Sequence, residues 1–145
     1  MQKKIFIVFL LLLPLLNFGQ ELEPKPDQIL TFEEVAQPPL AKACKRKKTV
    51  DEQRACTATY INMFVNRNFN TRMAAKLVKG VVKMEAQFII DTEGKVIEIY
   101  ASGGPEKLNR HLEEILSSLN NFQPAMQDGK AVEVLYILPV SMGFY

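Results

Sequence analysis

Histidine and cysteine, which often act as general bases, nucleophiles or metal ligands, are scarce in this chain. There is a single histidine, His111, and there are two cysteines, Cys44 and Cys56. His111 stands between Leu108 and Leu112 in a segment whose apolar residues have helical spacing, so we expect a histidine at the boundary of the core rather than a general base. A catalytic role would also require partner residues elsewhere in the chain.

The sequence does not supply such partners. It has no serine in a nucleophile elbow and no glycine-rich phosphate loop, and Gly103-Gly104 indicates only a turn before a proline. Glu113 and Glu114 are neighbours, and we expect them on the solvated side of a helix. The sequence therefore predicts a protein that is not an enzyme and that has no cofactor.

The two cysteines enclose a loop rich in basic residues, CKRKKTVDEQRAC. A disulfide that closes a loop of this length stabilises a fold by roughly 3 kcal/mol in the chain-entropy model. Zinc is the alternative, but a zinc site uses four ligands at paired short spacings, and His111 is distant in sequence. We predict a disulfide between Cys44 and Cys56 and no metal site. The cluster at 45–48 is expected to be a solvated loop, because two acidic residues follow it closely.

The N-terminal residues MQKKIFIVFLLLLPLLNFGQ combine two lysines with a short apolar run that contains a proline. A membrane-spanning helix needs about 20 apolar residues, so residues 1–19 are predicted to be a cleaved signal peptide rather than a permanent anchor. A bacterial lipoprotein would have a cysteine at the end of the apolar run, and this sequence has none there, so a lipid anchor is not expected. Export also exposes the cysteines to the oxidising conditions in which disulfides persist.

Loss of Lys3 and Lys4 lowers the count of basic residues from 18 to 16, which equals the count of acidic residues. A neutral mature protein argues against nucleic acid as a partner, because phosphate binding needs a basic excess. Residues 20–43 contain four prolines and predict an extended arm. Ile29, Phe32 and Val35 would allow the middle of this arm to lie along a sheet.

The apolar pattern after the second cysteine changes its period several times. Helical spacing over 57–69 predicts a helix, and alternation over 81–91 predicts a strand with one buried face. The turn DTEGK leads into a second strand, KVIEIYA, and a second helix begins at Pro105. The segment AVEVLYILPVSMGFY predicts a third strand. Its expected core face is Val132, Val134, Tyr136, Leu138 and Val140.

This order, helix-strand-strand-helix-strand, predicts an α+β domain over 44–145, with two helices packed on a small three-stranded antiparallel sheet. Pro139 lies inside the third strand, and a strand tolerates proline where the missing N–H faces solvent. The third strand is therefore predicted to be at an edge. Exposed edges tend to pair with something, and extended peptides are often bound in this way.

Several motifs together resemble the C-terminal domain of TonB, the periplasmic energy transducer. They are a D-x-x-G turn after an apolar strand, a valine-rich return, a helix, an aromatic-x-Pro-Ala step and an x-G-K-x-V-x-V strand. The resemblance covers roughly residues 35–144. In this sequence the motif residues are Asp91, Gly94, Val96, Ile99, Phe122, Pro124, Ala125, Gly129, Lys130, Val132 and Val134.

The resemblance implies a periplasmic domain that binds a short extended segment, the TonB box, of outer-membrane receptors in TonB-dependent transport. In the family this segment lies against the third strand. Carried over to this chain, the partner-binding residues are Ala131, Val132, Glu133, Val134, Leu135, Tyr136, Ile137 and Leu138. The alternative is a non-catalytic periplasmic scaffolding module that uses the same edge to form a homodimer.

Overall fold

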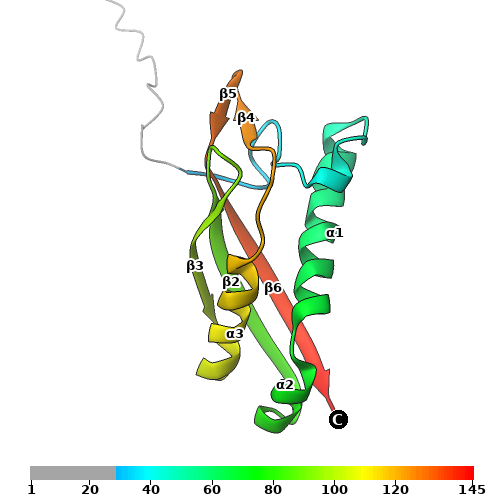
Figure 1. Ribbon diagram of the computed structural model, residues 1–145, viewed down its shortest axis with the longest axis vertical. Helices are drawn as coiled ribbons and strands as arrows, with labels where there is room; N and C mark the ends of the chain where they lie inside the picture. Colours follow the sequence, from blue (N-terminus) through cyan, green and yellow to red (C-terminus); the bar gives the residue numbers. More distant parts are fainter. Residues whose placement is uncertain (1–28) are drawn as a thin grey trace, which may run out of the picture.

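The computed structural model describes residues 29–145; the predicted signal peptide and the first part of the predicted arm lie outside this range. Figure 1 shows the arrangement of the elements along the chain. In chain order they are β1 (Leu30–Thr31), the 3-10 turn η1 (Lys42–Cys44), α1 (Val50–Asn68), α2 (Thr71–Leu77), β2 (Gly80–Ile90), β3 (Val96–Ser102), α3 (Glu106–Ser117), β4 (Ala125–Gln127), β5 (Lys130–Val132) and β6 (Val134–Phe144).

The main sheet has four strands in the order β1-β6-β2-β3, and β4 and β5 form a separate two-stranded sheet. β2 pairs antiparallel with both β6 and β3, whereas β1 pairs parallel with β6. In Figure 1, α3 lies in front of β2 and β3, and α1 runs beside β6. The predicted α+β class is confirmed, but the sheet is mixed and has one strand more than expected.

The core lies between the sheet and the helices, where the alternating patterns of the strands place it. The predicted inner face of β2 is buried along its whole length, and so is the apolar stripe that begins in α3. Burial of these side chains is the main stabilising term, because each fully buried aliphatic or aromatic side chain contributes about 1.5–3 kcal/mol. The residues are Val82, Met84, Ala86, Phe88 and Ile90 from the strand, and Leu108, Leu112, Ile115, Leu116 and Leu119 from the helix and the residues after it.

The turn between β2 and β3 depends on two residues of the D-x-x-G motif. The Asp91 Oδ1 atom accepts from the backbone N–H groups of Glu93 and Lys95, both at 2.9 Å. Gly94 has a φ of 80°, and a Cβ atom there would lie 1.7 Å from the Phe122 carbonyl oxygen. The Phe122 N–H in turn donates to the Gly94 carbonyl. Only glycine allows this approach, so the turn fixes the chain after α3 against the hairpin.

The predicted third strand is divided into β5 and β6. The Asp128-Gly129 pair has positive φ at both positions, 51° and 76°, which is the two-residue hairpin geometry favoured by Asp-Gly. The short hairpin pairs Gln127 with Lys130, and β6 begins after Glu133. Val132 is therefore outside the main sheet and only half-buried, while Val134, Tyr136, Leu138 and Val140 are buried as predicted.

Two differences concern the helices. The first helix begins at Val50, seven residues before the predicted start, because the Thr49 side chain caps it by accepting from the Glu52 N–H at 3.2 Å. A separate helix, α2, follows it, with Asn70 as its N-cap. Within residues 29–145, no helix has the length and apolar character needed to cross a membrane.

The last part of the predicted arm belongs to the folded unit. Phe32, Val35, Leu40 and Ala41 are buried, and two isolated bridges pair residues 37 and 40 with residues 126 and 123. The arm is thus fixed between the β4–β5 hairpin and α1.

Cys44 and Cys56 form a disulfide, as predicted, with a Cα–Cα distance of 5.7 Å. It joins η1 to the first part of α1, and the basic residues at 45–48 are all exposed. The bond therefore ties the end of the arm to the long helix, and the loop between them is in solvent.

Reduction of this disulfide is expected to lower the free energy of unfolding by roughly 3 kcal/mol, because the unfolded chain gains the freedom of an open loop. Urea denaturation with and without dithiothreitol measures the difference. The double variant Lys45→Ala/Lys47→Ala changes only exposed residues of the same loop and is expected to stay within about 0.5 kcal/mol of wild type. Equal denaturation midpoints for oxidised and reduced protein would contradict the prediction.

Candidate functional site

The candidate site is the outer edge of β6, the side that faces away from β2. The Leu135 carbonyl accepts from the Phe32 N–H at 2.9 Å, so the backbone groups of Leu135 point outward. Backbone N–H and C=O groups alternate sides along a strand. Ile137, Pro139, Ser141 and Gly143 therefore also point outward, and the residues between them pair with β2.

Most of this edge has no strand beside it. β1 pairs with β6 only at Val134 and Leu135. From Ile137 to Phe144, no other strand of residues 29–145 lies against the edge. The outward residues there are exposed, and Ile137 has 47% of its surface in solvent. The open part presents N–H groups from Ile137, Ser141 and Gly143, and carbonyl groups from these three and from Pro139.

The position of Pro139 explains why the strand tolerates a proline. Pro139 lies opposite Glu85 of β2, and its nitrogen is on the outer side, where the ladder with β2 needs no donor. The β2–β6 pairing therefore continues without a shift of register past the proline. β6 lies between β1 and β2 in the strand order, so the predicted edge strand has β1 beside it at 134–135, and within residues 29–145 only 137–144 has no outer strand.

The opposite edge of the sheet, formed by β3, is protected. The Glu113 Oε1 atom on α3 accepts from the Ala101 N–H at 2.9 Å, which occupies one of the outward donors. The pairing of β2 with β3 shifts register between Gln87 and Ile89, and Glu98 has a φ of 51°. Bulges and side-chain caps of this kind prevent edge pairing, so within residues 29–145 the outer side of β6 is the one long regular edge left open.

The structure distributes the predicted binding residues over several environments. Ala131 and Val132 belong to β5 and pair with β4, and Glu133 connects the two strands. Val134 and Leu135 have β1 as their outer neighbour. The side chains of Tyr136 and Leu138 are buried on the core face, and Ile137 alone among the eight combines an exposed side chain with a place on the open edge.

The apolar residues Phe32 and Val35 of the arm do not cover the solvent-exposed face of β6. Phe32 and Val35 turn to the opposite, helix-covered face. The Phe32 ring contacts Tyr136 edge to face, with 4.7 Å between the ring centroids. Burial against Tyr136 in the core removes more apolar surface from water than a place over the exposed Ile137 would.

Arg54 of α1 holds the arm in this position. Its guanidinium donates to the carbonyl oxygens of Phe32 and Val35, the latter at 2.9 Å. It also lies 5.7 Å from the centroid of the Phe32 ring. Charged hydrogen bonds are stronger than neutral ones, so Arg54 fixes the turn that ends β1 and thereby the point where the open edge begins.

The turn after β1 is closed by Glu34. Its carboxylate accepts from the Thr31 N–H at 3.0 Å and from the Thr31 hydroxyl at 2.9 Å. The hydrogen bond from the Thr31 backbone N–H, and to a smaller extent the one from its hydroxyl, lower the pKa of Glu34 below its ordinary value. The turn therefore prefers the ionised carboxylate.

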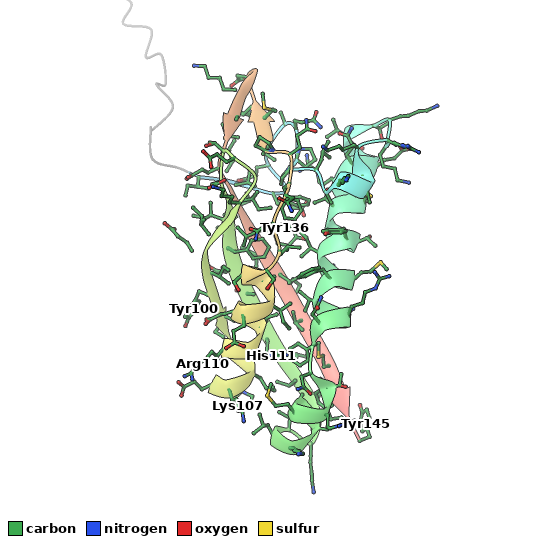
Figure 2. The ribbon with its side chains drawn as sticks, in the orientation of Figure 1. Tyr100, Lys107, Arg110, His111, Tyr136 and Tyr145 are labelled. Carbon is green, nitrogen blue, oxygen red and sulfur yellow. A yellow bond between two sulfur atoms is a disulfide. The ribbon has the colours of Figure 1, made fainter. Side chains whose placement is uncertain are left out.

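Hollows lie at both ends of the open edge. A small one of about 190 Å³ lies where β1 leaves β6 and is lined by 31–33 and 135–137. A larger one of about 860 Å³ lies at the other end, between α2 and the last residues of β6, where Tyr145 is seen in Figure 2. Its lining residues are Thr71, Arg72, Ala75, Val78, Lys79, Gly80, Gly143, Phe144 and Tyr145.

His111 has structural contacts. Its Nε2 atom accepts from the Asn70 N–H at 3.0 Å, and its ring lies edge to face with Phe69 at 5.1 Å. On α3, His111 faces the junction of α1 and α2 (Figure 2). It therefore helps to position α2, whose N-cap is Asn70, and so the wall of the larger hollow.

The sequence was scanned against models of known protein families and compared with curated proteins and with solved structures, and none of the three comparisons found a match.

Replacement of Arg54 by Met is expected to lower the free energy of unfolding by about 1.5–3 kcal/mol, because two partly buried carbonyl groups lose a charged donor. Urea denaturation measures this change. Hydrogen exchange at the Phe32 amide should also become faster, because that N–H forms the link to Leu135. Arg46→Met, at an exposed loop position, is the control and is expected to change stability by less than about 0.5 kcal/mol. Equal effects of the two substitutions would refute the role of Arg54.

Tyr136 gives a prediction about alkaline pH. Burial, together with the negative charge of Glu33, raises its pKa from 10.0 to about 12. Between these values the unfolded chain loses the phenolic proton while the folded protein retains it, so the free energy of unfolding falls as pH rises above 10. Tyr136→Phe should lose less stability than wild type between pH 10 and pH 12 in urea denaturation. Parallel losses in both proteins would contradict the assignment.

Proposed function

We propose that this protein is a periplasmic domain that binds extended peptide segments by adding them as a strand to the outer edge of β6. The observation that carries this proposal is the edge at 137–144, where outward backbone groups have no strand beside them within residues 29–145. The other edge of the same sheet is capped by Glu113 and distorted by a bulge. Such a difference between two edges is expected where one of them has a partner.

Recognition by this edge uses the main chain more than side chains. The open part has about eight residues and spans about 26 Å at ~3.3 Å per residue. A peptide laid along it gains hydrogen bonds from Ile137, Ser141 and Gly143, and Pro139 contributes only its carbonyl. Because Ile137 is exposed, a partner side chain that packs on it also removes apolar surface from water.

We further propose that the natural partner is the TonB box of an outer-membrane receptor in TonB-dependent transport. The resemblance to the TonB C-terminal domain supports this choice. Several residues that carry the resemblance also have structural roles. Asp91 and Gly94 form a turn that is hydrogen-bonded to Phe122, and Gly129 belongs to the hairpin turn that precedes β6. They define the path of the chain into the proposed binding strand.

The disulfide supports a place outside the cytoplasm. Disulfides persist in oxidising compartments such as the bacterial periplasm, and Cys44 and Cys56 are bonded. The apolar N-terminal run provides the export signal in this proposal.

Ile137→Pro is the direct test of strand addition. The substitution removes an outward N–H without touching the ladder to β2, and the proline ring occupies space that an incoming strand needs. We expect the Kd for a labelled TonB-box peptide from a receptor of the same organism to rise about tenfold or more, as measured by fluorescence anisotropy. Ile137→Ala keeps the N–H and is the matched control, and we expect it to raise the Kd only a fewfold.

Circular dichroism is used to check that each variant is folded. Ser141→Pro repeats the test at a second outward N–H donor. If folded Ile137→Pro and Ser141→Pro proteins bind the peptide as tightly as wild type, strand addition at this edge is wrong. Light scattering after size exclusion distinguishes the alternative: a dimer that both proline variants convert to monomers would assign the edge to a second copy of the chain.

A further inference from the structure

The two ends of the open edge carry opposite charges. At the end near Ile137, the turn after β1 has Glu33 and Glu34, and both residues are exposed. At the other end, Arg72 and Lys79 line the larger hollow. The edge therefore runs from an acidic turn to a basic hollow.

The basic end is free to bind an anion. Arg72 and Lys79 are exposed, and within residues 29–145 neither of them is in an ion pair. Among the described residues, 29–145, no acidic side chain lines the hollow. Lys83 lies on β2 directly opposite Ser141 and adds a third positive charge near this part of the edge.

The lining of the hollow indicates what kind of group it accepts. Ala75, Val78 and the Phe144 and Tyr145 rings form apolar walls, and the two basic side chains provide charge. Gly143, whose backbone groups point outward along the edge, also lines the hollow, so a strand added to β6 would lead directly into it. A short acidic side chain beside an apolar one matches these walls.

We propose that this hollow binds the acidic end of the peptide that pairs with β6, so that charge determines which way the peptide lies. This inference rests on the proposed function. Attraction to Arg72 and Lys79 favours an acidic end at α2, and repulsion by Glu33 disfavours the same end at the turn after β1. The partner class is therefore an extended segment of about eight residues with carboxylates at one end.

The test uses blocked synthetic peptides of about eight residues with alternating threonine and valine. One has two aspartates at its N-terminal end, a second has them at its C-terminal end, and a third has asparagines instead. We expect the better of the two acidic peptides to bind wild type about tenfold more tightly than the asparagine peptide at low salt, with the difference decreasing in high salt. Which acidic peptide binds better shows whether the strand is parallel or antiparallel to β6.

Charge-reversed variants locate the effect. Arg72→Glu/Lys79→Glu is expected to abolish the preference for the acidic peptide and to leave binding of the asparagine peptide unchanged. Lys45→Glu/Lys47→Glu makes the same change in net charge on the basic loop, at the opposite end of the molecule in Figure 1, and should preserve the preference. A spin label at the acidic end of the peptide should broaden the amide signals of α2 and not those of residues 31–35.

The outcomes separate the two proposals. If acidic and asparagine peptides bind equally and both lose binding to Ile137→Pro, strand addition stands and the role of the basic hollow is wrong. If the spin label broadens the amide signals of residues 31–35, the proposed direction of the peptide along β6 is wrong. If no peptide binds at all, both proposals fail.

Discussion

The antiparallel ladder between β2 and β6 is the interaction on which the rest of this structure depends. It pairs Gly80 through Ile90 with Phe144 through Val134 in a single register. In that register the even-numbered residues of β6 direct their side chains into the core and their backbone groups toward β2. The odd-numbered residues do the opposite, so one register determines the buried face of the strand and also its outward donors and acceptors.

This register explains why β6 tolerates a proline at position 139. A shift of one residue would place the proline nitrogen inside the ladder with β2 and would turn Tyr136 and Leu138 out of the core. The observed register avoids both penalties, and the only donor lost is on the outer edge. The proline therefore removes a donor only from the outer edge, where its carbonyl group can still accept a hydrogen bond.

The arm and the hairpin decide how much of the edge is open. β1 pairs with only two residues of β6 before the chain turns into the core, where Arg54 holds its carbonyls and Phe32 contacts Tyr136. Glu113 meanwhile occupies the outward Ala101 N–H on the other side of the sheet. Side-chain contacts from two helices thus shape both edges of the sheet, one by ending a strand and the other by capping a donor.

Local pattern in the sequence determined much of this molecule. Two-residue alternation identified the buried face of β2, and helical spacing identified the stripe of α3, because each pattern depends on residues close together in the chain. The disulfide was predicted because the sequence has only two cysteines, whereas a zinc site needs four ligands. The start of α1 was signalled by Thr49 and Glu52 but lay outside the apolar pattern. The division at Asp128-Gly129 needed only the turn preference of that pair.

Other features were decided by tertiary structure. Nothing near Thr31 in sequence indicates that β1 lies against Leu135, that Arg54 holds the arm, or that α2 and Phe144 enclose a hollow lined by two basic side chains. The predicted binding residues 131–138 lie partly in β5 and partly beside β1, whereas within residues 29–145 the part of β6 without a neighbouring outer strand is 137–144. Such features depend on contacts between segments far apart in the chain, and only the folded arrangement brings those segments together.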